Sequence, residues 1–309
     1  MTLIRVGTRD SALAMAQTEY VTKQLSLMYT DIDFAIVPMK TTGDKFLETS
    51  LSKIGDKGLF TKELEIALQQ GVIDMAVHSL KDLPTELPPG CELLAITERI
   101  DPRDVLVTRS WKTLEELPPG SRLGTSSLRR RAQLLNYRAD LTFCDIRGNV
   151  PTRLAKMIKE GLDAIVIAAA GLERLGLQQF IVQRLPDSVC LPAVGQGALG
   201  IEARAGDETV SGIVLALNHP PSEMATAAER AFLRRLGGGC QIPIAALGTL
   251  EDGKLRLQGL VASPDGEKLI RGERAVSGAP LTRNTAEQLG VSLAEELLAQ
   301  GAGRLLSCF

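Results

Sequence analysis

The stretch LIRVGTRDSALAMAQTEYVTKQLSLM, residues Leu3–Met28, predicts a strand followed by a turn and a helix. The run Leu3–Val6 is typical of a buried strand, and Gly7–Asp10 has the composition of a turn. Ser11 is a suitable N-cap for the helix that follows. The apolar residues of this helix recur on one face, at Leu13, Val21, Leu25 and Met28. Leu3–Met28 is therefore one strand–helix unit of an α/β fold.

The same alternation of strand and helix continues through the first two thirds of the chain, which favours α/β architecture with largely parallel sheets. Two segments, Glu98–Asp104 and Leu191–Glu202, look like crossings between domains. From about Pro220 a helix, two strands around a turn and a last helix predict a small α+β domain. We therefore expect α/β domain 1 at residues 1–98 with 197–217, α/β domain 2 at 99–196, and the α+β domain at 218–309.

Composition and charge narrow the classes of function. The chain has 309 residues, of which 44% are apolar, and this argues against disorder. A net charge of −2 at pH 7 argues against a general nucleic-acid binder. No apolar run reaches the roughly 18 residues of a membrane span, and we expect no leader before the first strand. The five cysteines are scattered singly, so we expect a reducing cytosol and no metal site.

Cys240 follows three glycines in the segment Leu236–Pro243. Glycines leave the thiol approachable, and the nearby Arg234 and Arg235 favour the thiolate form. This setting is typical of an attachment site or a nucleophile. A lone cysteine is also commonly a small buried apolar residue, and that interpretation stays open here.

Four polar side chains, His78, Ser79, Lys81 and Asp82, follow an apolar strand in the segment His78–Pro84. Ligand sites of open α/β sheets lie at such carboxyl ends. Asp82 is suited to stabilise a developing cation or to move a proton, and Lys81 to hold a carboxylate. An ordinary ion pair between strand and loop is the alternative.

Arginines with Ser, Thr or Asn neighbours stand at three predicted strand-to-helix junctions. In Gly124–Arg131, hydroxyl groups at a helix start precede three arginines, and Arg147-Gly148-Asn149 with Arg153 repeats the pattern. Arg9 with Ser11 forms the third junction. Guanidinium forks and helix N-termini bind carboxylates, so the set predicts a ligand with several carboxylates.

A Gly/Lys loop, Lys53–Phe60, ends in an aromatic residue and has the character of a lid. It lacks the spacing of a phosphate-binding loop or a dinucleotide fingerprint. Phe60 is therefore a candidate to cover a site.

Five segments together resemble the porphobilinogen deaminase family, also called hydroxymethylbilane synthases. They are HSLKDLP (His78–Pro84), GTSSLRRRAQL (Gly124–Leu134), RGNVPTRL (Arg147–Leu154), LPAVGQGALGIE (Leu191–Glu202) and ERAFLRRLGGGCQIPI (Glu229–Ile244). The resemblance covers nearly the whole chain and keeps the family's order. It implies two lobes like those of type II periplasmic binding proteins, with a third domain that carries the cofactor loop.

The resemblance also implies site roles. Cys240 would hold a dipyrromethane cofactor through a thioether. Asp82 would contact pyrrole N–H groups, stabilise the cationic azafulvene formed as ammonia leaves, and take part in proton transfer with Lys81 beside it. The implied cofactor-binding residues are Cys240, Lys81, Asp82, Thr125, Ser126, Ser127, Arg129, Arg130, Arg147 and Gly148. The implied substrate-binding residues are Arg9, Ser11, Phe60, Arg147, Arg153, Arg174 and Gln196.

The implied activity is the head-to-tail joining of four porphobilinogen molecules with loss of ammonia, followed by hydrolysis that frees hydroxymethylbilane. A monomer in the cytoplasm is expected, without nucleic-acid or membrane partners. Two residues depart from the family pattern: Asp56 stands where a second loop glycine is expected, and Cys308 has no evident role.

Two other functions fit parts of the pattern. A non-catalytic protein that binds small polycarboxylates would also use two α/β lobes closing around an anion, although a periplasmic version needs a signal peptide. A thiol acyltransferase would use Cys240 as its nucleophile, although neither histidine stands in a recognisable partner motif.

Overall fold

The computed structural model describes residues 2–45, 58–238, 242–278 and 281–306. The chain divides into two compact units, residues 1–100 with 198–223 and residues 101–197 with 224–309. The predicted boundaries at 98 and 196 lie within two residues of the first two unit boundaries. The C-terminal segment falls in the same unit as residues 101–197, so a separate third domain stays a prediction.

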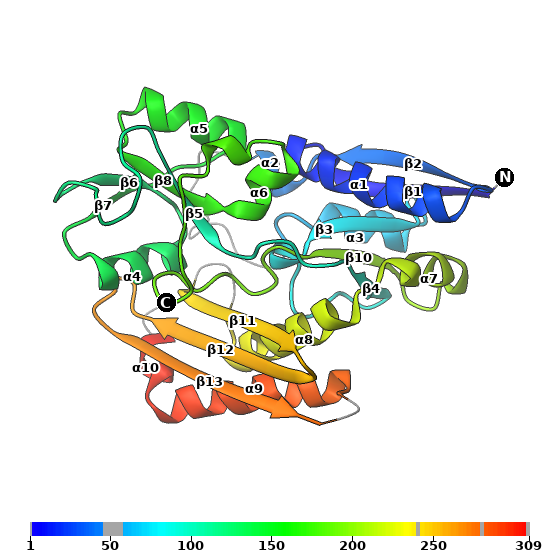
Figure 1. Cartoon of the computed structure of the whole chain (residues 1–309). Coiled ribbons are helices and arrows are strands. Elements are labelled where there is room, and N and C mark those ends of the chain that lie inside the picture. Colours follow the sequence, from blue (N-terminus) through cyan, green and yellow to red (C-terminus); the bar gives the residue numbers. More distant parts are fainter. Residues whose placement is uncertain (1, 46–57, 239–241, 279–280, 307–309) are drawn as a thin grey trace. The chain divides into compact units, whose positions relative to one another are not determined.

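The first unit is built on a five-stranded sheet. Its strands are, in spatial order, β2 (Ile32–Met39), β1 (Thr2–Arg9), β3 (Met75–Ser79), β10 (Leu199–Arg204) and β4 (Cys91–Ile96) (Figure 1). β2, β1 and β3 are parallel, and β10 runs antiparallel to both of its neighbours. The helices of this unit are α1 (Ala12–Met28), α2 (Thr42–Lys45), α3 (Lys62–Gln69) and α7 (Glu208–Val214).

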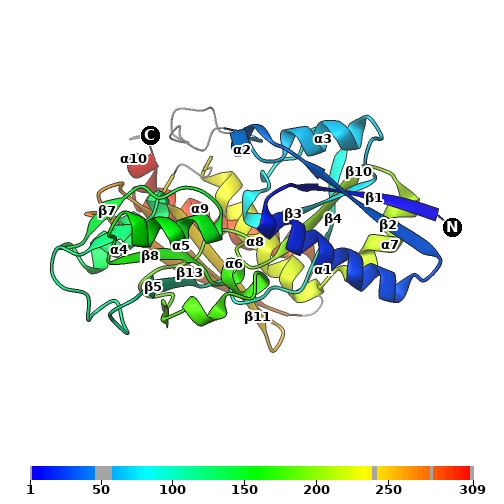
Figure 2. The same ribbon diagram turned by 90° about the horizontal axis from the view of Figure 1, so that it is seen from above.

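Alternation along β3 explains how helices cover both faces of this sheet. Met75 and Val77 share an apolar cluster with α1 and α7, whereas Ala76 belongs to a cluster with α3. Successive side chains of a strand point to opposite faces, so a fully apolar strand must be covered on both. Figure 2 shows α1 and α3 on opposite sides of the sheet. Ser11 caps α1 by accepting from the Ala14 N–H at 3.4 Å, as predicted.

The second unit repeats this architecture in its first part. The strands are, in spatial order, β7 (Thr142–Cys144), β6 (Arg122–Gly124), β8 (Ala164–Ala168), β5 (Asp104–Thr108) and β9 (Gln183–Arg184). The helices are α4 (Leu128–Tyr137), α5 (Val150–Lys159) and α6 (Ala169–Arg174). Val166 of β8 packs in a cluster with Leu134 of α4, and Ile165 packs in a cluster with Met157 of α5.

Both α/β sheets follow one topological plan. In each, three parallel strands are followed by one antiparallel strand and then by an edge strand. The antiparallel strand is β10 in the first unit and β5 in the second, and each begins within a few residues of a unit boundary. The predicted fold class, two α/β domains with crossings and a small C-terminal α+β part, is confirmed.

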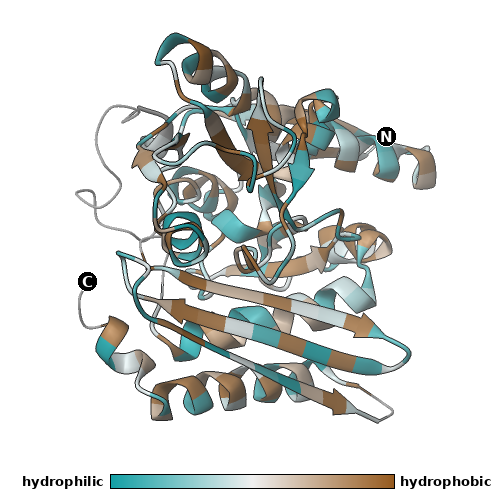
Figure 3. Ribbon diagram, turned by 60° about the vertical axis from the view of Figure 1, so that its left-hand side comes forward, coloured by the Kyte–Doolittle hydropathy of each residue, from teal (hydrophilic) through white to brown (hydrophobic). Residues whose placement is uncertain are grey.

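The C-terminal part is a three-stranded antiparallel sheet with helices. It contains β11 (Ile244–Glu251), β12 (Lys254–Ala262), β13 (Leu269–Ser277), α8 (Pro220–Arg235), α9 (Arg283–Ala299) and α10 (Ala302–Leu306). Polar and apolar residues alternate along the first five residues of β12, and its last four residues are all buried (Figure 3). One face of the sheet packs in a cluster with Phe232 of α8 and Leu293 of α9. The other face shares a cluster with Ala132 of α4, which ties this part to the rest of its unit.

Candidate functional site

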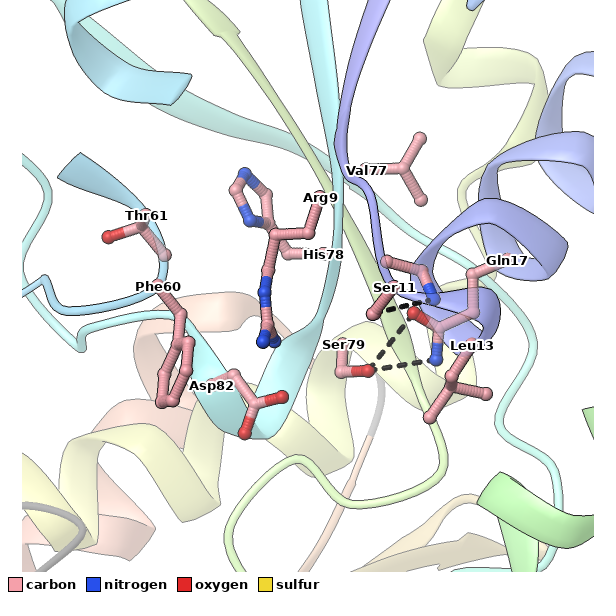
Figure 4. Close-up of a pocket in the computed structure, with 11 residues that line it drawn as sticks. Arg9, Ser11, Leu13, Gln17, Phe60, Thr61, Val77, His78, Ser79 and Asp82 are labelled. Atoms are coloured by element: carbon pink, nitrogen blue, oxygen red, sulfur yellow. Dashed lines mark hydrogen bonds between the residues drawn. The ribbon is translucent and has the colours of Figure 1, made fainter. Parts of the chain in front are cut away.

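A pocket in the first unit gathers several predicted site residues, and we call it the Asp82 pocket (Figure 4). It opens where β1 and β3 end, because the carboxyl ends of parallel neighbouring strands meet at one edge of a sheet. Its lining residues are Arg9, Ser11, Leu13, Ala14, Gln17, Phe60, Thr61, Val77, His78, Ser79 and Asp82.

Asp82 is held by a short 3₁₀ turn, Leu80–Asp82, directly after β3. Leu80 and Leu83 on either side of it are buried, and the Leu80 N–H donates to the Ala198 carbonyl at 3.0 Å. Lys81 and Asp82 are both partly exposed. Two buried leucines therefore fix the backbone of a turn whose charged side chains remain accessible, as a residue that meets a ligand requires.

Arg9 and Phe60 contact each other across the pocket. The guanidinium carbon of Arg9 lies 4.2 Å from the centroid of the Phe60 ring, within the range of a cation–π interaction. Figure 4 shows the Arg9 guanidinium, the Phe60 ring and the Asp82 carboxylate pointing toward one another. A Cβ on Gly43 would clash with the Phe60 ring, so a glycine is needed at this position for the ring to fit.

Gln17 and Ser79 form a polar pair that the sequence analysis did not single out as a pair. Gln17 Nε2 donates to Ser79 Oγ at 2.8 Å, and Ser79 Oγ lies 3.1 Å from Gln17 Oε1. Gln17 is 3% exposed and comes from α1, whereas Ser79 ends β3. A polar residue on the buried face of a helix is the signal that could have identified it.

His78 is turned into the interior of the unit. Its Nε2 lies 2.9 Å from a carboxylate oxygen of Glu202, and both side chains are almost fully buried. Burial raises the pKa of the nearby Glu65 above its usual range. Burial, with the charges of Glu202 and Glu65, also raises the pKa of the Cys91 thiol to about 12, so Cys91 is a neutral, unreactive thiol at pH 7.

The N-termini of α4 and α5 carry the predicted anion-binding motifs of the second unit. Ser127 caps α4 by accepting from the Arg130 N–H at 3.4 Å. Asn149 caps α5 by accepting from the Thr152 N–H at 2.9 Å. The Thr125 hydroxyl accepts from the Ser127 N–H at 3.2 Å. Helix N-termini with their polar caps favour anions, as the sequence pattern indicated.

The hydroxyl of Ser126 has a different use. It donates to the Ile146 carbonyl at 3.0 Å and accepts from the Ile146 N–H at 3.0 Å. Ser126 therefore joins the segment that begins α4 to the one that precedes α5. These two bonds hold the two anion-binding junctions together.

Arg129 and Arg130 point into the unit rather than along a solvated helix face. Arg129 Nη1 lies 2.8 Å from Asp104 Oδ2 and donates to the Leu191 carbonyl at 2.6 Å. Arg130 Nη2 donates to Asp104 Oδ1 at 2.7 Å, and its Nη1 donates to the Val166 carbonyl at 3.2 Å. Both arginines are 6% exposed, so their described contacts are internal ones.

Three further predicted residues donate hydrogen bonds to main-chain carbonyls, and a fourth, Arg147, directly precedes one of the residues that accept them. Arg153 Nε donates to the carbonyl of Gly148 at 2.8 Å, and Gly148 has a φ of 112°, which favours glycine. Arg174 Nη2 donates to the Gly197 carbonyl at 2.8 Å. Gln196 is buried, and its Nε2 donates to the Pro102 carbonyl at 2.6 Å. Arg147 is partly exposed, directly before Gly148.

Of the predicted residues that the structure describes, Arg9, Ser11, Phe60 and Asp82 line one pocket in the first unit, and the others, Lys81 apart, lie in the second unit. Cys240 and Asp56 lie outside the described residues, as does Cys308. Within the described ranges, no group of His, Cys, Asp and Glu side chains could hold a metal ion. Nor does any helix there have the length and apolar character to cross a membrane.

Comparison with known proteins gives consistent matches along the chain. Residues 4–212 match a family model described as porphobilinogen deaminase, dipyromethane cofactor binding domain, and residues 224–299 match its C-terminal domain. The porphobilinogen deaminase of Moorella thermoacetica is 55% identical over 98% of this chain and 95% of that protein. The porphobilinogen deaminase of Pelotomaculum thermopropionicum is 53% identical over 98% and 96%.

Among solved structures, the methionine-binding protein MetQ is 15% identical and matches with a TM-score of 0.45. This match covers 74% of the present chain and 93% of MetQ.

Proposed function

The chain belongs to the porphobilinogen deaminase family, whose members act in tetrapyrrole biosynthesis with a dipyrromethane cofactor, and we propose that Asp82 is the acid–base group of its reaction. The observation that carries this proposal is the Asp82 pocket. It combines one accessible carboxylate with Arg9 and the ring of Phe60 at the end of a buried strand.

The proposed reaction is the stepwise addition of four porphobilinogen molecules, head to tail, with loss of one ammonia at each step. Hydrolysis then frees hydroxymethylbilane while the dipyrromethane remains on Cys240. When bound, dipyrromethane supplies the electron-rich pyrrole carbon to which the first porphobilinogen molecule is joined.

Asp82 contributes through its charge and its proton affinity. As ammonia leaves, positive charge develops on a pyrrole, and a carboxylate stabilises that charge when it lies close. At a separation of about 4 Å and an effective dielectric constant near 20, the attraction amounts to about 4 kcal/mol. This energy corresponds to about a thousandfold in rate. The same carboxylate then accepts the proton that the pyrrole carbon loses.

Arg9 and Ser11 provide polar groups for the incoming pyrrole, and Lys81 for the cofactor and the growing chain. Porphobilinogen carries an acetate and a propionate side chain, which cationic side chains recognise. Phe60 restricts the guanidinium of Arg9 through their cation–π contact. The pocket would therefore meet the substrate with a cation that is already oriented.

The second unit has the donors that a dipyrromethane with several carboxylates requires. Two capped helix N-termini stand beside Thr125, Ser127, Arg147 and Arg153, with Arg174 at the end of α6. Arg130 Nε is buried without a hydrogen-bond partner in the described structure. This donor set fits the group, and the residues that carry it lie within the part of the chain, residues 4–212, that matches the cofactor-binding family model. Attachment through Cys240 rests on the GGC motif in the sequence.

We further propose that the enzyme works as a monomer in the cytoplasm, with porphobilinogen as its small-molecule partner. The net charge of −2 supports the absence of a nucleic-acid partner. A non-catalytic polycarboxylate-binding protein is the alternative, and the identity to deaminases along 98% of the chain argues against it.

The decisive experiment is the intact mass of the purified protein. We expect an excess over the sequence mass that matches two linked pyrroles, and we expect Cys240→Ser to lack it. Cys144→Ser serves as a control that keeps the excess, because Cys144 has no glycine run beside it. An active enzyme without any added mass would reject the assignment.

A further inference from the structure

Asp104, the first residue of β5, has a fully buried carboxylate that is bonded on both oxygens. Oδ1 accepts from Arg130 Nη2 at 2.7 Å and from Gln196 Nε2 at 2.9 Å. Oδ2 lies 2.8 Å from Arg129 Nη1 and accepts from the Cys190 thiol at 3.4 Å. We call these five residues the Asp104 cluster.

The Asp104 cluster holds an excess positive charge. Two guanidiniums and one carboxylate sum to +2 − 1 = +1. Burial and the charge of Asp104 raise the pKa of the Cys190 thiol to about 12, so the thiol is neutral at pH 7. Burial alone would raise the pKa of Asp104, but Arg129 and Arg130 lower it well below its ordinary value, so Asp104 is ionised. A buried net charge is unfavourable without a partner, so this cluster favours an anion beside it.

The geometry points to Asp104 as a positioning residue that orients Arg129 and Arg130 before the pyrrole carboxylates bind. This inference rests on the proposed function, because it takes the ligand to be the dipyrromethane and the chain that grows from it. Asp104 itself is fully buried, so it would act on a ligand only through the two arginines that it contacts. The sequence analysis did not include it among the site residues.

The physical advantage is preorganisation. An arginine side chain loses rotamer freedom when it binds a carboxylate, and this loss weakens binding. Here Arg129 loses its rotamer freedom on folding, because Asp104 and the Leu191 carbonyl already fix its Nη1. A guanidinium has five N–H donors, so one nitrogen bound to Asp104 leaves others for a ligand.

Through Gln196, the same carboxylate also connects the first and last residues of segment 101–197 within the second unit. Gln196 bonds to Asp104 and to the Pro102 carbonyl, and Gln133 of α4 donates to the Leu191 carbonyl at 3.0 Å. Removing the charge of Asp104 would therefore release the arginines and the returning segment together. A change in cofactor assembly is the expected consequence.

The experiment measures how fast the full-length protein acquires its cofactor. Protein produced without a supply of porphobilinogen is mixed with porphobilinogen, and its intact mass is followed over time. Asp104→Asn keeps the shape but removes the charge, and we expect loading to slow by about tenfold or more. Loading of a folded Asp104→Asn protein at the wild-type rate would overturn the proposal.

Asp101→Asn is the matched control. Asp101 also pairs with two arginines of the same unit, Arg103 at 2.8 Å and Arg184 at 2.7 Å, but these arginines are about 40% exposed. We expect this variant to load at the wild-type rate. Equal slowing in both variants would show a general effect of losing an Asp–Arg pair and would also overturn the proposal.

A double variant keeps the test decisive if Asp104→Asn does not fold. Asp104→Asn with Arg130→Gln restores the cluster's charge to +1, because one carboxylate and one guanidinium are both removed. We expect it to load several-fold more slowly than Arg130→Gln alone, since Arg129 has lost its anchor. Identical rates in these two proteins would show that Asp104 does not position Arg129.

The wild-type protein separates this proposal from the proposed function. If wild-type protein gains no mass from porphobilinogen, the function itself is wrong. If wild-type protein gains the mass of two pyrroles and all Asp104 variants do so equally fast, only the role of Asp104 is wrong.

Discussion

The Asp82 pocket and the Asp104 cluster use the same two residue types in opposite surroundings. In the pocket, Asp82 and Arg9 are partly exposed and lie at the end of a sheet. In the cluster, Asp104 is fully buried and its two arginines are 6% exposed. Exposure leaves the first pair available to a substrate, whereas burial holds the second in one arrangement.

This difference shows that an arginine in a predicted anion site can either face a pocket or stabilise the fold through buried contacts. Arg9 lines the Asp82 pocket, where its guanidinium lies against the Phe60 ring and near Asp82 (Figure 4). Arg129 and Arg130 bind Asp104 and main-chain carbonyls, so part of their bonding capacity stabilises the fold. Substitutions in the two regions should therefore affect different measurements.

The largest effect is expected from Asp82→Asn. Loss of the carboxylate charge should lower kcat by about a thousandfold, because about 4 kcal/mol of charge stabilisation is removed. The added mass on the protein should remain, and single-turnover kinetics with porphobilinogen would measure the rate. Asp33→Asn, at an exposed position of β2 in the same unit, is the control with normal turnover. Near-normal turnover in Asp82→Asn would remove Asp82 from the mechanism.

The second-largest effect is expected on the free energy of unfolding, which substitutions in the two regions should change by different amounts. Arg130→Met should lower the free energy of unfolding by about 3 kcal/mol, because it breaks a buried ion pair. Arg9→Met should lower it by less than about 1 kcal/mol, because the side chain is partly exposed. Urea unfolding followed by fluorescence of Trp111, the single tryptophan, would measure the effect in the second unit, and circular dichroism would cover the first.

Arg9→Met and Arg130→Met should also differ in which step of the reaction they impair. Arg9→Met should keep its cofactor and show a raised KM for porphobilinogen, since its charge meets the substrate. Arg130→Met should be impaired in cofactor assembly. Equal destabilisation of both variants, with unaltered kinetics, would contradict the distinction between the two regions.

The smallest effect is expected from Phe60→Leu. A cation–π contact contributes about 0.5–1 kcal/mol, so its loss should raise KM by about two- to fivefold with little change in kcat. Steady-state kinetics would measure the change, and Phe180→Leu, at an exposed position of the second unit, is the matched control. An unchanged KM in Phe60→Leu would show that the ring does not orient Arg9.

Much of the fold followed from local sequence patterns. Ser11 is confirmed as the N-cap of α1, but β1 runs from Thr2 to Arg9, so the turn predicted at Gly7–Asp10 is wrong for its first three residues. The helix, two strands and last helix predicted from about Pro220 are confirmed as α8, β12, β13 and α9, with β11 as a further strand of the same sheet. The pattern did not reveal β5 and β10 as inner strands of the two sheets. β5 begins at the last residue of one segment interpreted as a crossing, and β10 lies largely within the other. Each strand pairs with residues far apart in the chain, which leaves no local periodicity.

The candidate site shows the same division. Arg9, Ser11, Phe60 and Asp82 were each recognisable from their place in a motif, and the structure brings them into one pocket. Gln17 and Gly43 were missed because their importance lies in a contact with a distant residue, Ser79 and Phe60 respectively.

By itself, the sequence determined the α/β class, the family and the motifs that carry acidic and basic groups, because these depend on residue type and local spacing. Only the tertiary structure decided which of those groups are exposed. Asp82 and Asp104 are both aspartates near strand ends, yet one borders a pocket and the other is enclosed by Arg129 and Arg130. Burial depends on which distant segments pack together, and the charges found there decide whether a carboxylate can act on a substrate or stabilise the protein.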